Sequence, residues 1–132
     1  MRTIVVGYDG SDVARRALGR AAEVADEGAS VVVVHATPSV YGDAAVGPAD
    51  PDEEARAEPL LHEARELLGR RGLEAEVRRP VGPAAAALVS AADELQADLI
   101  VVGRRRNPAA HLLGSVSSRV VREAGCDVLV VR

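Results

Sequence analysis

Lysine, phenylalanine and tryptophan are absent from this chain of 132 residues. Without lysine, a lysine Schiff base, a P-loop lysine and the lysine of a two-component receiver domain are all excluded. Aromatic residues make up only 2% of the chain, which argues against the stacking platforms that bind single-stranded nucleic acid. The formal charge of −4 likewise provides no basic footprint for a duplex. We therefore expect no nucleic-acid partner.

Cysteine is represented by Cys126 alone, so no internal disulfide forms. A single cysteine fits a reducing compartment, and we interpret Cys126 as a small packing residue. Residues 1–3 run straight into an apolar segment, which predicts that no signal peptide is present. No apolar run approaches the ~20 residues of a membrane span. These features predict a cytoplasmic protein with no membrane segment.

Apolar residues, 48% of the chain, alternate between strand-like and helix-like segments. Strands are predicted at residues 3–8, 31–36, 73–79, 99–102 and 126–131. Helices are predicted to begin at Ser11, Leu60, Gly82-Pro83 and Gly114-Ser115. Five strands alternating with four helices predict one α/β domain over residues 1–132, with a parallel sheet and helices on both faces.

The second of these helices has a start that the apolar pattern defines less sharply than in the other three. Its apolar pattern is best defined from Leu60 to Arg71, and Pro59 is expected to open the helix or to kink it. The preceding residues 37–51 are rich in proline and glycine and show little periodicity. We predict that they form a flexible loop within the domain.

Two predicted strands end in residues that suit a ligand. Asp9, Gly10 and Ser11 follow the first strand, and a loop with three arginines runs from Gly103 to Gly114 after the fourth. The N–H groups and the positive dipole end of the helix that starts there suit an anion. Ligands bind where the strand order of such a sheet reverses, so we place that point between these two strands. The alternative is a pair of ordinary turns, in which the Asp9 side chain accepts hydrogen bonds from its own loop and the arginines are solvated.

Other chemistry-bearing residues give weaker signals. His35, His62 and His111 lack the spacing of a metal site. We interpret His35 as a hydrogen-bonded core residue. For the loop residue His111, a contact with a ligand is the less favoured interpretation. The serines lack the context of a nucleophile elbow, so acyl transfer is not expected.

Five segments resemble the universal stress protein family in their order and spacing, namely residues 4–11, 33–36, 97–103, 114–117 and 126–131. The resemblance covers essentially the whole chain and implies strand order 3-2-1-4-5 with bound ATP, accompanied by Mg²⁺. It implies that Asp9 and Ala36 contact the adenosine, and that the loop after the fourth strand holds the ribose and phosphates. The site residues implied in this way are Gly7, Tyr8, Asp9, Ala36, Val102, Gly103, Arg106, Gly114, Ser115 and Val116.

This chain departs from the family pattern Gly-x2-Gly-x9-Gly-Ser/Thr in the loop. Arg106 stands at the middle glycine, and ten residues separate Gly103 from Gly114 where the pattern has twelve. Arginine at a position that needs glycine costs roughly 1 kcal/mol in strain. Arg104, Arg105 and Arg106 offer guanidinium contacts to phosphate in compensation.

Three functions therefore stay open. The first is a stress-response regulatory protein that binds adenine nucleotide, and the second is a dimeric interaction module of the same fold without a ligand. An enzyme with a slow ATPase or a nucleotide-transferring activity ranks third, because no general base is identifiable in the loop, and we do not expect an enzyme.

The last strand, residues 128–131, ends the chain and lies at an edge of the sheet in the implied order. An apolar edge invites pairing with another chain, and a two-fold dimer satisfies both edges with one self-complementary patch. The family resemblance implies the same homodimer. The alternative is a monomer whose edge is shielded by Arg132 and by the twist of the sheet.

Overall fold

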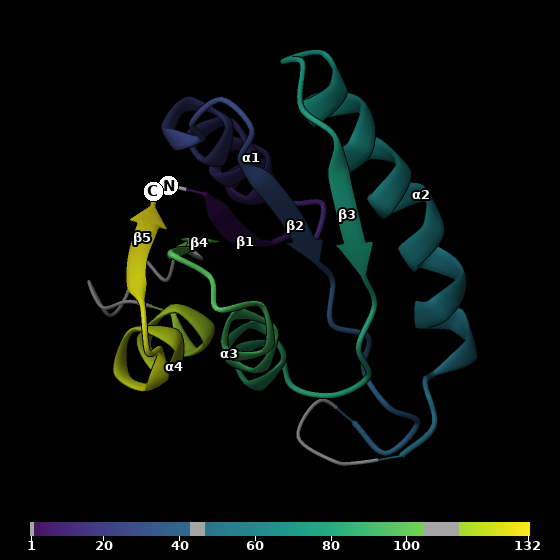
Figure 1. The fold of residues 1–132 in the computed structure, drawn as a ribbon. Helices are drawn as coiled ribbons and strands as arrows, with labels where there is room; N and C mark the ends of the chain where they lie inside the picture. The colour runs from purple at the N-terminus through teal and green to yellow at the C-terminus, as the bar shows by residue number, and fades with distance from the viewer. Residues whose placement is uncertain (1, 43–46, 105–113) are drawn as a thin grey trace.

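A computed structural model of the chain describes residues 2–42, 47–104 and 114–132 (Figure 1). The strands are β1 (Thr3–Gly7), β2 (Ser30–Val34), β3 (Ala75–Arg78), β4 (Leu99–Gly103) and β5 (Asp127–Val131). The helices are α1 (Asp12–Val24), α2 (Pro51–Gly69), α3 (Ala84–Leu95) and α4 (Ser115–Glu123). All strand pairs are parallel in the order β3-β2-β1-β4-β5, which confirms the predicted α/β class and strand order.

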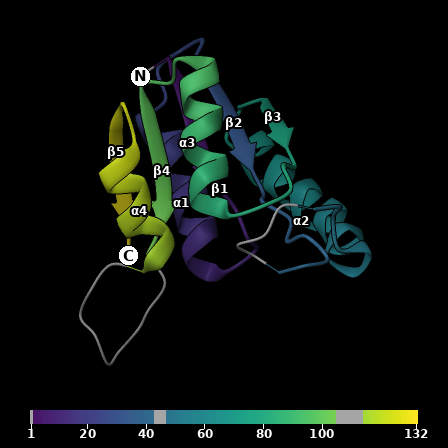
Figure 2. The same cartoon turned by 90° about the horizontal axis from the view of Figure 1, so that it is seen from below.

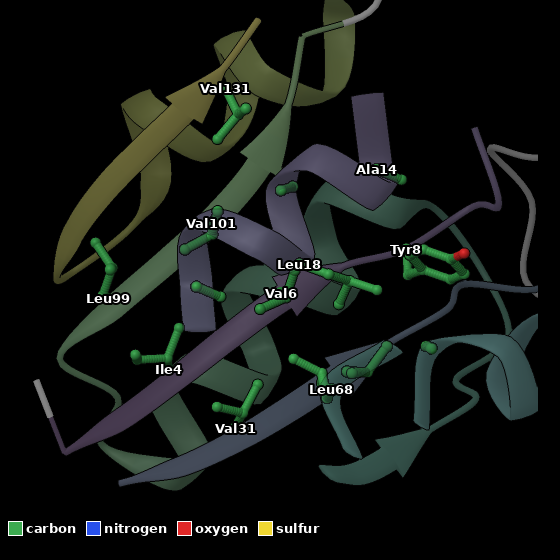
Figure 3. Packing of buried hydrophobic residues seen from close by; sticks show 14 of the residues in the cluster. Ile4, Val6, Tyr8, Ala14, Leu18, Val31, Leu68, Leu99, Val101 and Val131 are labelled. Carbon is green, nitrogen blue, oxygen red and sulfur yellow. The ribbon is translucent and has the colours of Figure 1, made fainter. Parts of the chain in front are cut away.

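Helices cover both faces of the sheet. Figure 1 shows α1 and α2 on one face and α3 and α4 on the other. Successive strand residues point to opposite faces, so Ile4 and Val6 join the α1/α2 cluster while Val5 joins the α3/α4 cluster. Figure 3 shows the first cluster, with Leu18 and Leu68 packed against β1 and β2. Strands buried on both faces explain the near-continuous runs of valine.

The start of α2 corrects one sequence prediction. The helix begins at Pro51, nine residues before Leu60, with the Asp50 side chain accepting from the N–H groups of Asp52 and Glu53. Pro59 lies inside the helix, and the carbonyl that it leaves without a partner belongs to Ala55. Ala55 and Pro59 are both exposed, so water can bond that carbonyl. An N-cap and proline at the first helical position stabilise the early turns enough to offset the interruption.

None of the helices within the three described ranges is long and apolar enough to cross a membrane. The longest of them, α2, has 19 residues and buries only one side, through Ala57, Leu61, Ala64 and Leu68.

The segment after β2 is more organised than predicted. Thr37 and Ser39 are buried, and the Ser39 hydroxyl donates to the Gly42 carbonyl at 3.0 Å. Backbone N–H groups of Val40 and Asp50 bond back to carbonyls within the same segment. Residues 37–42 and 47–50 are therefore held in place by hydrogen bonds, which proline and glycine content alone does not reveal.

Asp98 ties the amino ends of two central strands together. Its Oδ2 accepts from the N–H groups of Arg2 and Thr3 at 2.9 and 3.0 Å, just before β4 begins. These backbone bonds, that from Thr3 first, lower the pKa of Asp98. The charged carboxylate thus stabilises the folded state above its unfolded pKa, and this stabilisation is lost as the pH falls through the lowered folded pKa.

We expect Asp98→Asn to lower the urea midpoint at pH 7 and to have little effect once the pH is below the pKa of Asp98. Urea titrations of both proteins from pH 7 down to pH 2 measure this. The exposed Glu74, changed to Gln, is the control. An equal loss of stability at every pH contradicts the assignment.

Candidate functional site

The sheet has its switch point between β1 and β4. These neighbours are followed by helices on opposite faces, α1 after β1 and α4 after β4. In sheets of this kind, ligands bind in the crevice at the carboxyl ends of two such strands. Figure 2 shows α1 and α4 on either side of β4, with β5 at one edge of the molecule and α2 beyond β3 at the other. The turn 9–11 and Gly103 therefore lie at the same edge of the sheet, at the ends of the neighbouring strands β1 and β4.

The turn 9–11 closes on itself and caps α1. Asp9 Oδ1 accepts from the Ser11 N–H at 3.0 Å and from the Ser11 hydroxyl at 2.6 Å. Ser11 Oγ accepts from the Ala14 N–H at 3.2 Å, and Asp12 places a negative charge in the first turn. Gly10 has a φ of +81°, which favours glycine. The Asp9 side chain is nevertheless exposed, so its role in the turn and a ligand contact are compatible.

The first turn of α4 has the opposite character. Its N-cap, Gly114, provides no side-chain hydrogen bond, and no acidic residue lies in the turn. Ser115 is exposed, while the buried Ser117 donates to the Gly103 carbonyl at 3.3 Å and fixes the helix against the end of β4. An anion therefore fits the start of α4, whereas the start of α1 is already occupied by Ser11 and made negative by Asp12.

Arg104 directly follows Gly103, whose carbonyl accepts from Ser117 of α4. Its backbone N–H donates to the Val131 carbonyl at 2.7 Å. Its Nε is buried and has no hydrogen-bond partner in the part of the chain that the structure describes. A buried guanidinium donor needs an acceptor, so a phosphate oxygen fits this environment. Three other loop residues considered from the sequence lie outside the described residues, namely Arg105, Arg106 and His111.

Some residues implied by the family resemblance pack instead of lining the crevice. A Cβ at Gly7 would lie 3.2 Å from Leu88 Cδ1 of α3, so Gly7 serves helix packing. Val102 is 2% exposed and Val116 is half-buried, and both belong to the α3/α4 cluster. Only their backbone groups are available to a ligand. Ala36 is half-buried just beyond β2 and lies at the same edge as Asp9.

Tyr8 is buried beneath the crevice and bonded at three points. Its N–H donates to the Val34 carbonyl at 3.0 Å, and its carbonyl accepts from His35 Nδ1 at 2.8 Å, which confirms His35 as a hydrogen-bonded core residue. Its hydroxyl donates to Glu63 Oε1. Figure 3 shows that hydroxyl at the outer end of the cluster.

Glu63 was not anticipated from the sequence. It accepts from Tyr8 and also from Arg15 Nε at 3.0 Å. Burial, followed by the hydrogen bond to Glu63, raises the pKa of Tyr8, whereas the bonds from Tyr8 and Arg15 lower the pKa of Glu63. The partners are 55 and 48 positions apart, so no local pattern indicated them.

A hollow of about 580 Å³ lies elsewhere, between α3 and the end of β3. No helix fills this part of the sheet face, because α3 packs mainly over β1. Its arginines are already paired, Arg78 with Glu94 at 3.0 Å and Arg79 with Glu58 at 3.1 Å. Within the described ranges, no group of three metal-ligating side chains is present. The switch point therefore remains the candidate site.

The fold defines the class of the protein, a doubly wound α/β domain whose switch point lies between β1 and β4. The model of the universal stress protein family matches residues 1–132. The chain belongs to the universal stress protein family, as its sequence motifs predicted.

Individual relatives agree with this assignment. Universal stress protein Rv1636 of Mycobacterium tuberculosis is 39% identical, over 98% of this chain and 95% of the relative. A solved universal stress protein in complex with cAMP is 35% identical with a TM-score of 0.82, covering 99% of this chain and 97% of the other. The universal stress protein of Archaeoglobus fulgidus in complex with dAMP is 30% identical with a TM-score of 0.81, covering 100% and 98%.

Proposed function

We propose that this protein is a cytoplasmic stress-response module that binds adenine nucleotide, ATP in particular, and acts by binding instead of by catalysis. The observation that carries the proposal is a pair of donor groups at the switch point that lack a side-chain partner among the described residues: the first turn of α4, whose N-cap Gly114 makes no side-chain hydrogen bond, and the buried Nε of Arg104. Similar proteins in complex with cAMP and dAMP support it.

The proposed pose follows from the contrast between the two helix starts. The phosphates lie on the N–H groups of Ser115 and Val116, with the Ser115 hydroxyl and Arg104 as further donors. The adenosine lies toward Asp9 and Ala36, away from the negative first turn of α1. Mg²⁺ enters with the phosphates of ATP, which supply oxygen ligands to the ion.

Calorimetric titration with ATP and Mg²⁺, and with AMP, tests the proposal. We expect binding of both, and we expect Ser115→Ala to weaken ATP binding by about 1 kcal/mol, or roughly fivefold, the usual effect of one hydrogen bond. Ser90→Ala on the remote helix α3 is the control. Absence of heat and of a thermal shift at millimolar nucleotide contradicts the proposal.

A dimeric module without a ligand is the second candidate, favoured by Arg106 and by the shortened loop. A mass spectrum of the protein released by denaturation separates the two candidates, because co-purified adenine nucleotide supports only the first.

Both candidates share a proposed homodimer through β5. This strand lies at the sheet edge next to β4. Because the Val131 carbonyl accepts from Arg104 on the β4 side, the N–H and C=O groups of Val128 and Val130 point to the open side. Two copies paired antiparallel satisfy these groups.

A further inference from the structure

Two side chains of α2 reach the turn that is proposed to contact adenosine. Leu60 and Glu63 are three positions apart and therefore lie on one side of the helix. Leu60 packs directly on Gly10, where a Cβ would overlap its Cδ2 atom. Glu63 accepts from the hydroxyl of Tyr8, the residue that precedes Asp9. Helix α2 thus contacts the turn at Gly10 and the residue before the turn, Tyr8.

Glu63 also holds the far end of the turn. It accepts from Arg15 Nε at 3.0 Å, and Arg15 Nη1 donates to Asp12 at 2.8 Å. Asp12 and Arg15 form the first turn of α1, directly after Ser11. The carboxylate of Glu63 therefore joins the residue before the turn to the helix after it.

We propose that Leu60 and Glu63 are positioning residues for the nucleotide site, which hold the turn 9–11 in its binding conformation without touching the ligand. The inference rests on the proposed function. A turn that is already ordered loses less conformational freedom on binding, so fixing it raises affinity. The bonds of Ser11 to Asp9 are local and exposed, so contacts from α2 supply the long-range constraint.

The same helix offers a matched control. Glu58 of α2 pairs with Arg79 at 3.1 Å, and its side chain is exposed. The side chains of Glu63 and Arg15 are partly exposed as well. Glu58 lies five positions before Glu63 and pairs with Arg79 after β3 and, at 3.9 Å, with Arg65 of the same helix. Its loss removes an ion pair from α2 and leaves the turn 9–11 untouched.

Amide hydrogen exchange of the ligand-free protein provides the first readout. We expect Glu63→Ala to speed exchange of the Ser11 and Ala14 N–H groups about tenfold, with no change at Arg70 and Ala97, which are bonded elsewhere. Glu63→Gln keeps an acceptor for Tyr8 and should recover most of the protection. Unchanged exchange at Ser11, or an equal rise at all four amides, overturns the inference.

Affinity for AMP, measured by calorimetry on the same proteins, provides the second readout. We expect Glu63→Ala to weaken binding about tenfold, Glu63→Gln about threefold and Glu58→Gln less than twofold. Parent-like affinity in Glu63→Ala overturns the inference alone, whereas no binding by the unaltered protein overturns the proposed function.

Discussion

Val130→Pro is expected to weaken the proposed β5 dimer by about 2–6 kcal/mol, enough to give monomers at micromolar concentration. Proline removes the N–H that Val130 points to the open side of β5 and leaves the bonds to β4 intact. One unsatisfied buried group costs about 1–3 kcal/mol, and two-fold symmetry doubles the loss. Analytical ultracentrifugation across a dilution series measures it.

Val130→Ala is the matched control, because it shortens the side chain and keeps the N–H. We expect that variant to remain a dimer with a modest loss of packing against the α3/α4 cluster. If the unaltered protein sediments as a monomer at micromolar concentration, or if both variants dissociate equally, edge pairing through β5 is wrong.

Gly103→Val is expected to cost about 3 kcal/mol of unfolding free energy, at the upper end of overpacking effects. A Cβ at Gly103 would lie 2.9 Å from Val13 Cγ1 and 3.2 Å from the Val13 backbone carbon. The backbone of α1 has to move away from β4, since a side-chain rotation alone does not relieve the second contact. The crevice is shaped by these two elements, so nucleotide affinity should fall as well.

Gly7→Ala is the comparison for this glycine. Its new Cβ meets the end of the flexible Leu88 side chain at 3.2 Å, so we expect a cost below 1 kcal/mol. Urea unfolding of both variants measures the difference. Equal stabilities would show that α1 and β4 have more room than the structure indicates.

The strand order and the two helix layers were predictable because the evidence for them is local and repeated. Runs such as residues 31–34 are apolar at every position, which only a strand buried on both faces requires. The start of α2 was not predictable, because a proline such as Pro59 indicates a helix boundary unless it is known to face solvent. Asp50, the N-cap of the helix, was not recognised as a helix start from the sequence.

The candidate site divides along the same line. Asp9, Gly103 and Ser115 were located from the sequence because turns and helix starts carry their own residue signals. Gly7 and Val102 were grouped with them through the family resemblance. In the structure, Gly7 packs against Leu88 of α3, and Val102 belongs to the α3/α4 cluster. The contact of Leu60 with Gly10 and that of Glu63 with Tyr8 were not predicted, because contacts across some 50 residues leave no periodic pattern in the sequence.

The central place of β1 has a consequence for synthesis in the cell. This first strand to be made pairs with β2 on one side and with β4 on the other, and Asp98, which holds its start, is 96 positions beyond Arg2. At about 5–20 residues per second, the ribosome takes roughly 5–20 s to reach that partner. One edge of an Ile-Val-Val segment therefore waits unpaired during translation. The nascent chain is most exposed to aggregation in that interval, before the second half of the sheet exists.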